Sequence, residues 1–153
     1  MLLDDIIAVT FTTIRDTCLC LDADMQPMRD VIVWIDNREA QEIQYFNATS
    51  SMMFSFAGMK DAVELQRKVS ACNWIAANQP EIWAKTAKFV FISTWLTYKL
   101  CGRLAESTAG AIGHIPYDNK IRTWMRPNDM RRKIFDVRDD QLFELVEPGT
   151  ELG

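Results

Sequence analysis

Three short apolar runs occupy the first 34 residues, and they constrain the fold of this chain more than any other feature of its sequence. The runs cover residues 6–11, 17–21 and 31–34. Because their hydrophobic side chains follow one another with little polar alternation, each run is typical of a strand covered on both faces. Residues 22–27, with two aspartates and a proline, predict a turn between the second and third strands. We therefore expect three strands in one sheet.

The rest of the chain is expected to be mainly helical. Asp36 suits a helix cap, Pro80 suits a first helical turn, and Gly102 suits a helix end. Apolar spacing and boundary residues predict helices over 36–46, 61–75, 81–88, 94–101, 129–135 and 139–145. The stretches between them predict a loop at 47–59, a β-like segment at 109–115 and a turn at 148–149. Together these elements predict an α/β fold, with helices packed on a mixed sheet.

Charge and hydropathy exclude two classes of partner. The formal net charge is −4, and the longest cationic run, 131–133, is flanked by aspartates. Nucleic-acid binding requires a concentrated positive face, so we expect no nucleic-acid partner. No apolar run approaches the ~20 residues of a membrane span, and the two aspartates after the first three residues leave no cationic leader. We expect no membrane association.

The cysteines indicate a reducing compartment. Cys18, Cys20, Cys72 and Cys101 form no C-x-x-C pair, and the chain has a single histidine to join them. This spacing matches no zinc pattern, so we expect no metal site. Four reduced thiols are typical of a cytoplasmic protein.

Both ends of the chain lie close to expected structure. The first predicted strand begins at residue 6, and the sequence stops shortly after the turn at 148–149. We therefore expect residues 1–153 to be a single domain segment. Strand edges near 6–11 or 17–21 would then lack a partner, and such edges recruit other chains. Self-association is the expected consequence.

Three stretches carry patterns in a fixed order. The first, over 7–39, contains Arg15-Asp16, the acidic turn 22–27 and the pattern Trp34-x-Asp36-x-Arg38. The second contains, in order, Asn73-Trp74, Pro80-Glu81-Ile82-Trp83, Lys88 and the run from Trp95 to Gly102. The third is looser, with small residues over 107–113, then Asp118, Trp124 and the closing 146–153. In order and spacing the three stretches resemble the FGGY family of carbohydrate kinases, a branch of the actin-like ATPase superfamily.

This resemblance implies both a fold and an activity. It implies part of a ribonuclease H-like (actin/hexokinase-type) domain, the N-terminal, sugar-binding domain of the family, lacking its N-terminal phosphate hairpin. Family members use ATP and Mg²⁺ to phosphorylate a sugar or polyol hydroxyl, with an aspartate as general base. The phosphate hairpin and the general base would both lie outside this sequence. The chain therefore contains no catalytic residue by this resemblance, and we expect it to be inactive alone.

The resemblance also implies acceptor-binding residues. Glycerol kinases carry arginine–glutamate where this chain has Arg15-Asp16, and there both side chains bind the hydroxyls of the polyol, whereas xylulose kinases usually carry methionine–histidine. Trp34 matches a tryptophan that packs on the carbon face of the substrate. The alternatives are a surface ion pair for Arg15 and Asp16, and a core side chain for Trp34. Asp36 and Arg38 are expected to support the site or the local structure.

His114 is interpreted as structural. It is the only histidine, and no serine, cysteine or carboxylate stands near it at the spacing of a catalytic triad. For the chain as a whole, the leading interpretation is the acceptor-recognising segment of a carbohydrate kinase. A truncated, non-catalytic protein that keeps a sugar-binding or partner-binding surface is the alternative.

Overall fold

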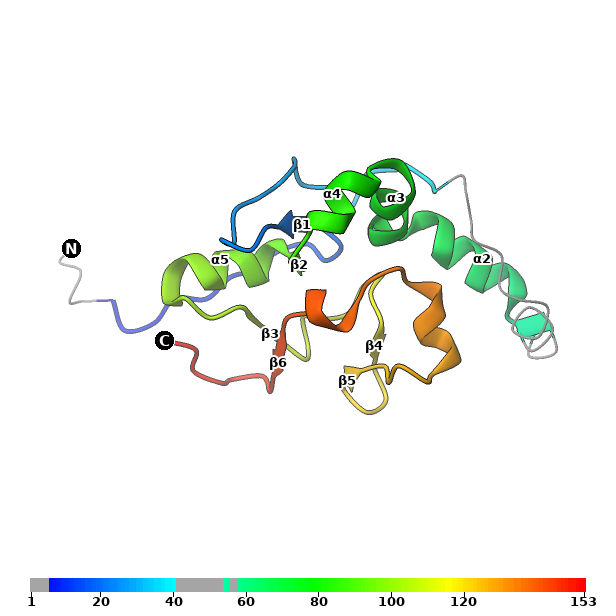
Figure 1. Cartoon of the computed structure of the whole chain (residues 1–153). Helices are drawn as coiled ribbons and strands as arrows, with labels where there is room; N and C mark the ends of the chain where they lie inside the picture. The colour runs from blue at the N-terminus through cyan, green and yellow to red at the C-terminus, as the bar shows by residue number, and fades with distance from the viewer. Residues whose placement is uncertain (1–5, 41–53, 56–57) are drawn as a thin grey trace.

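A computed structural model describes residues 6–40, 54–55 and 58–153, and shows a mixed α/β chain (Figure 1). The strands are β1 (Cys18–Leu21), β2 (Lys88–Phe91), β3 (Ala105–Ser107), β4 (Tyr117–Asp118), β5 (Thr123–Trp124) and β6 (Glu144–Val146). The α-helices are α2 (Lys60–Val69), α3 (Ala71–Asn78), α4 (Pro80–Lys85) and α5 (Ile92–Cys101). Two 3-10 helices, η2 (Met130–Ile134) and η3 (Asp139–Gln141), precede β6.

β1 is the buried strand at the centre of the fold. It pairs antiparallel with β2, with Cys18 opposite Phe91 and Leu21 opposite Lys88, and all four of its residues are buried. On its other side the chain turns back, and the backbones of Cys18 and Ile32 exchange two hydrogen bonds of 3.0 and 3.1 Å. The Asp22 carboxylate closes the turn by accepting from two backbone N–H groups at 2.9 Å. The second predicted strand and the turn after it are confirmed.

The expected strand at 6–11 is wrong, because the described residues there are exposed and form no strand. Ile7 is 99% exposed and Val9 64%. An apolar run is buried as a strand only where another strand lies beside it, and none of the described residues pairs with this one. The third expected strand is reduced to the single bridge at Ile32, while Trp34 is 54% exposed. β1 is bordered on both sides, so the expected unpaired edge at 17–21 is also wrong.

The single mixed sheet is likewise corrected. The described residues form three separate two-stranded sheets: β1–β2 and β4–β5 are antiparallel, and β3–β6 is parallel. No strand joins one pair to another within the described ranges. The strands of the second and third pairs are two or three residues long, so side-chain packing rather than sheet hydrogen bonding connects the layers.

The predicted helices were partly right. The helix expected over 61–75 is divided into α2 and α3 at Ser70, whose backbone is extended and whose hydroxyl donates to the Gln66 carbonyl at 2.5 Å. α5 ends at Gly102, which has a φ of 75°, as the sequence predicted. Residues 36–40 are not helical, because the Asp36 carboxylate accepts from the Arg38 backbone in a tight turn. The rest of that expected helix, and most of the loop at 47–59, lies outside the described residues.

The two polar helices expected near the C-terminus are only the short η2 and η3. Between them Phe135 is extended, and Phe135 and Val137 both enter the core, a spacing of two that no helix can provide. Residues 144–146 then form β6 rather than a helix. The segment at 109–115 is not a strand: it begins in a turn, where Gly110 and Ala111 both donate to the Ser107 carbonyl, and continues without regular secondary structure. The closing turn at 148–149 is confirmed by Gly149, with a φ of 86°.

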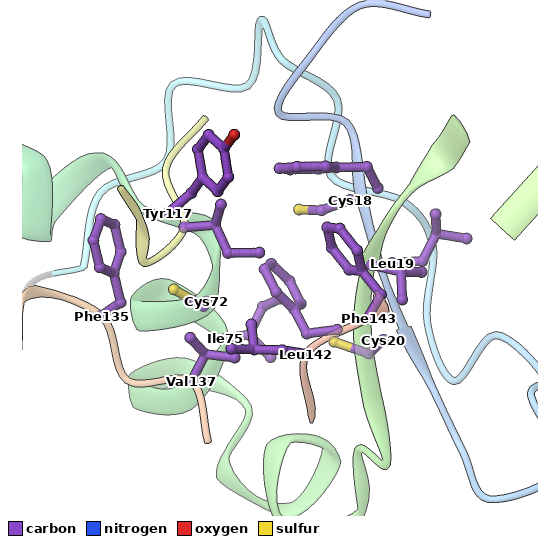
Figure 2. Close-up of a cluster of buried hydrophobic side chains, with 14 of the residues drawn as sticks. Cys18, Leu19, Cys20, Cys72, Ile75, Tyr117, Phe135, Val137, Leu142 and Phe143 are labelled. Carbon is purple, nitrogen blue, oxygen red and sulfur yellow. The ribbon is translucent and has the colours of Figure 1, made fainter. Parts of the chain in front are cut away.

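The hydrophobic core lies between β1, α3 and the C-terminal segment (Figure 2). Cys20 and Cys72 are fully buried there, which raises the pKa of the Cys72 thiol to about 12. The ring of Phe143 packs against aromatic rings from two different strands, β2 and β5. The ring centroid of Phe143 lies 5.7 Å from that of Phe91 and 5.0 Å from that of Trp124.

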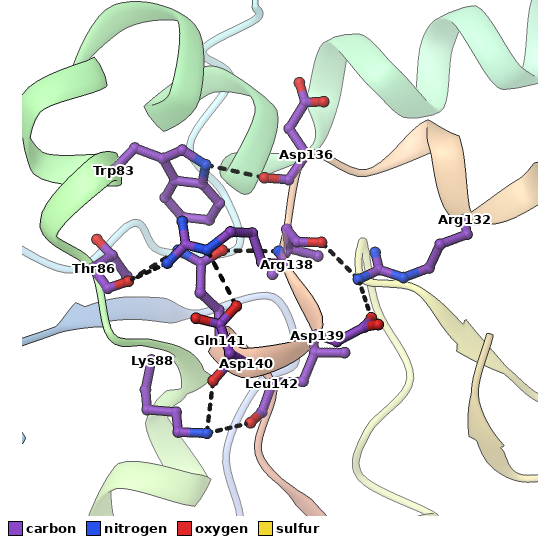
Figure 3. A network of polar contacts seen from close by, with 11 residues as sticks. Trp83, Thr86, Lys88, Arg132, Asp136, Arg138, Asp139, Asp140, Gln141 and Leu142 are labelled. Carbon is purple, nitrogen blue, oxygen red and sulfur yellow. Dashed lines mark hydrogen bonds and ion pairs between the residues drawn. The ribbon is translucent and has the colours of Figure 1, made fainter. Parts of the chain in front are cut away.

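A set of side chains, which we call the backbone clamp, ties the irregular segment 133–142 to the rest of the fold (Figure 3). Gln141 and Arg138 both donate to the Thr86 carbonyl, at 3.0 and 3.1 Å. The other members donate to carbonyls of the segment: Asn73 to Ile134, Trp83 to Asp136, Lys88 to Asp140 and Leu142, and Arg132 to Val137. Much of the second sequence pattern, including Asn73 and Trp83, therefore has a structural role. No helix in the described part of the chain is long and apolar enough to cross a membrane.

Candidate functional site

The candidate site begins at the turn that enters β1. Asp16 has a φ of 64°, a left-handed conformation that aspartate tolerates better than most side chains. Two residues later the chain enters the buried strand β1, and the Thr17 carbonyl accepts from the Ile92 backbone at 2.9 Å. The sharp turn separates its two polar residues: Arg15 is exposed, and Asp16 turns toward the interior.

Asp16 meets His114, which lies 98 positions away in the sequence. Asp16 Oδ1 accepts from the backbone N–H of His114 at 2.7 Å, and Asp16 Oδ2 lies 3.1 Å from His114 Nδ1. One residue therefore contacts both oxygens of the carboxylate. Gly113 makes this approach possible, because a Cβ there would lie 2.4 Å from Asp16 Oδ1 and 3.1 Å from Phe91 Cζ.

The pair also shifts the titration of both its members. Burial opposes ionisation of Asp16, but the hydrogen bonds from His114 and the nearby positive charges outweigh it, so the pKa of Asp16 is lowered. The hydrogen bond to Asp16 raises the pKa of His114 against the opposing effect of burial. Both shifts favour the charged forms, so the pair is a carboxylate beside an imidazolium over part of the pH range.

A small cavity lies behind the pair. It has a volume of about 20 Å³ and is lined by Asp16, Cys18, Ala71, Phe89, Phe91 and His114. That is room for one water molecule and not for a sugar. A larger ligand would have to approach from the solvent side, where the side chains of Asp16 and His114 remain 30% and 39% exposed.

The free bonding capacity at this turn suits a hydroxyl-rich ligand. A carboxylate offers about four lone-pair directions, and His114 occupies two of them. Arg15 is exposed beside it and brings donors to the same turn. Cys18 is not a nucleophile here, because burial raises its pKa and keeps the thiol neutral. Among the residues that the structure describes, no three His, Cys, Asp or Glu side chains are grouped to hold a metal ion.

In the described part of the chain, the other predicted site residues make no hydrogen bond, ion pair or ring contact with Arg15 or Asp16. Asp36 and Arg38 form an ion pair of 2.6 Å, and the Arg38 guanidinium lies 4.4 Å from the centre of the Trp74 ring. Trp34 is largely exposed, and within 6–40 and 58–153 no hydrogen bond or ring contact joins it to Arg15 or Asp16. Asp36 and Arg38 therefore contact each other and Trp74, and the roles of Trp34, Asp36 and Arg38 at the site stay predictions.

His114 is the residue that sequence reasoning missed. Its neighbours in the sequence gave no sign of a carboxylate, because its partner stands at the opposite end of the chain. The one available indication was Gly113, since a glycine beside the only histidine permits a close backbone approach. That indication could not have identified Asp16 as the approaching group.

Comparison with known proteins agrees with the family resemblance. The whole chain, residues 1–153, matches the N-terminal domain of the FGGY family of carbohydrate kinases. It is 32% identical over 136 residues to the autoinducer-2 kinase of Klebsiella pneumoniae, covering 88% of this chain and 23% of that protein. It is 24% identical to the glycerol kinase of Thermococcus kodakarensis, covering 98% of this chain and 30% of that protein.

The fold is also similar to that of a solved kinase structure. The crystal structure of gluconate kinase from Lactobacillus acidophilus superposes with a TM-score of 0.68 at 18% identity, over 97% of this chain and 30% of that one. The chain belongs to the FGGY family of carbohydrate kinases. It spans less than a third of the length of the relatives it matches.

Proposed function

We propose that this chain is the acceptor-recognising part of an ATP-dependent carbohydrate kinase, in which Arg15 and Asp16 bind hydroxyl groups of a sugar or polyol. The family membership supports the reaction class, since the relatives are kinases of several different acceptors. One observation carries the site: the Asp16 carboxylate is held by His114 and still has exposed bonding capacity beside Arg15.

The chemistry of the pair fits a polyol acceptor. A carboxylate accepts hydrogen bonds from two neighbouring hydroxyls, while a guanidinium donates to their oxygens. Holding the acceptor in this way restricts its orientation before phosphoryl transfer, which lowers the entropic part of the barrier. Trp34 would then cover the carbon face of the acceptor, with Asp36 and Arg38 fixing the adjacent turn.

The chemical step itself is assigned to other parts of the complete enzyme. We propose that this chain forms part of a ribonuclease H-like domain whose phosphate hairpin and general base lie outside residues 1–153. ATP and Mg²⁺ would bind there, and no described residue is proposed to hold them. On this basis the chain alone is inactive toward ATP. From its reduced cysteines we further propose that the enzyme acts in the cytoplasm.

Acceptor kinetics on the protein expressed from its full reading frame test this site. The acceptor panel includes glycerol, xylulose and gluconate, the substrates named for the matched kinases. Hydrogen bonds to a charged group are worth roughly 1.5–3 kcal/mol, so Asp16→Ala and Arg15→Ala should each lower kcat/KM for the acceptor by about 10- to 150-fold. The KM for ATP should stay unchanged.

Asp140→Ala is the matched control, because Asp140 forms an exposed ion pair of 3.1 Å with Arg138, away from the Asp16 turn. It should leave the acceptor kinetics unchanged. Asp16→Ala kinetics equal to those of the wild type would show that Arg15 and Asp16 are only surface residues.

The second candidate is a non-catalytic protein, because the partly exposed Asp16 turn could bind a sugar without any phosphoryl transfer. Such a protein would keep the fold as a sugar-binding or partner-binding module. Absence of phosphorylation of any acceptor by the full reading frame, together with acceptor binding in calorimetry, would favour this candidate. We also expect self-association, now through exposed apolar residues such as Ile7 and Val9, which light scattering would detect as a mass above that of the monomer.

A further inference from the structure

We propose that His114 is a positioning residue for acceptor recognition, acting by holding the Asp16 carboxylate in one orientation. This inference rests on the proposed function, since it requires Asp16 to bind the acceptor. It assigns a role in binding to a residue that the sequence patterns left as structural, and it explains why this chain places its only histidine after Gly113.

The geometry is that of a two-point hold. The backbone N–H of His114 donates to Asp16 Oδ1, and the ring nitrogen Nδ1 contacts Asp16 Oδ2. Rotation of the carboxylate would therefore break one contact or both. Gly113 also lies close to Asp16 Oδ1, and it can do so because it has no Cβ. This close approach leaves the carboxylate little room to move. The remaining lone pairs of Asp16 therefore point in fixed directions before any acceptor arrives. Such pre-organisation improves binding by removing the cost of ordering the side chain.

The surroundings make the ring contact sensitive to pH. The titratable and charged groups that face the pair are Arg15 beside it and the neutral thiol of Cys18 on β1. The elements behind the cavity contribute only Ala71, Phe89 and Phe91. His114 is therefore the titrating group here, with its pKa raised by the hydrogen bond to Asp16, and the contact with Asp16 is strongest when the ring is protonated.

Two substitutions of His114 separate positioning from packing. His114→Asn places a neutral amide N–H where Nδ1 stands, so it keeps a donor to Asp16 without a titrating ring. His114→Ala removes the donor and leaves only the backbone contact. We expect His114→Ala to raise the KM for the acceptor about tenfold with little change in kcat, and His114→Asn to stay within about threefold of the wild type.

The pH profile supplies a readout that packing alone would not change. In the wild type, the KM for the acceptor should rise as pH rises through the pKa of His114, and in His114→Asn this dependence should be absent. Because His114 is the only histidine of the chain, its ring resonances can be followed in the 153-residue chain by NMR without assignment. The substitution Asp16→Asn should lower the pKa of the His114 ring, because it removes the carboxylate that stabilises the imidazolium.

The outcomes distinguish the positioning role of His114 from the acceptor site at Asp16 on which that role depends. If Asp16→Ala leaves acceptor kinetics unchanged, the proposed site falls and the role of His114 falls with it. If Asp16→Ala raises the KM while His114→Ala does not, only the positioning role is overturned. Should His114→Ala fail to fold, the pH profile of His114→Asn and the NMR titration decide the matter, and a pKa unmoved by Asp16→Asn refutes the pairing.

Discussion

The backbone clamp and the Asp16–His114 pair are both polar clusters, yet they are built in opposite ways. The clamp is redundant and closed: Gln141 is fully buried, and the Thr86 carbonyl accepts from two different side chains. The pair is sparse and open, because one residue holds the carboxylate and both side chains remain partly exposed. Figure 3 shows the hydrogen bonds from clamp side chains to backbone carbonyls, together with the ion pairs of Arg132 and Arg138.

This difference indicates what each cluster contributes. Buried polar groups must be satisfied internally, so a cluster whose donors bond backbone carbonyls mainly stabilises the fold. An open cluster contributes little to stability, since exposed charges are screened by solvent, but it keeps lone pairs for an incoming hydroxyl. Substitutions in the clamp should therefore affect stability, and substitutions at the pair should affect acceptor binding.

The largest effect is expected from breaking the clamp at Asn73. Its amide donates to the carbonyls of Arg67 and Ile134 and accepts from the Asp136 backbone, and the residue is only 3% exposed. Asn73→Ala should lower the free energy of unfolding by about 2–4 kcal/mol, because buried groups lose their partner. Denaturant unfolding measures this loss.

Asn78→Ala is the matched control in the same helix, α3. Asn78 is exposed, and among the described residues its side chain bonds the Trp74 carbonyl one turn earlier and nothing else. Its replacement should therefore change stability by less than about 0.5 kcal/mol. Equal losses in the two variants would show that the clamp is not the stabilising cluster that we describe.

The second effect tests the Asp16–His114 pair with the same substitution at two glycines, only one of which lies against the pair. Gly113→Ala should displace the Asp16 carboxylate and lower acceptor kcat/KM about tenfold, because the new Cβ would overlap Asp16 Oδ1. Gly110→Ala would place a Cβ 2.5 Å from Glu106 Oε1, a similarly close approach that does not involve Asp16. Both should destabilise the fold by about 1–3 kcal/mol, and only the first should change acceptor kinetics. Equal kinetic losses would contradict a local role for Gly113.

The smallest effect is the pH dependence of stability. Because the pKa of His114 is raised above 6.5, its contribution is fully present below that pH and is lost as pH rises through the raised value. Because the pKa of Asp16 is lowered below 3.8, its contribution is present above that pH and is lost as pH falls through the lowered value. The stability difference between wild type and His114→Asn should therefore be greatest between about pH 4 and 6.5. A difference that does not vary with pH would mean that the pair is not ionised in the folded chain.

Local patterns were sufficient where a single segment decides its own structure. The apolar run 17–21 contains the buried strand β1, the aspartates of 22–27 form the turn, and Gly102 ends α5. Each of these depends on side-chain size, on local hydrogen bonding, or on the freedom of glycine at positive φ. The ordered patterns also identified the family, which the match over the whole chain confirms.

What the sequence by itself determined, then, was the family, the mixed α/β class and the central strand. Only the tertiary structure decided that Asp16 meets His114 across 98 positions, that 6–11 is exposed, and that 129–145 holds short 3-10 turns rather than helices. The physical reason is the same in all three cases. Burial and pairing depend on which distant segment lies alongside, and no periodicity within a single segment carries that information.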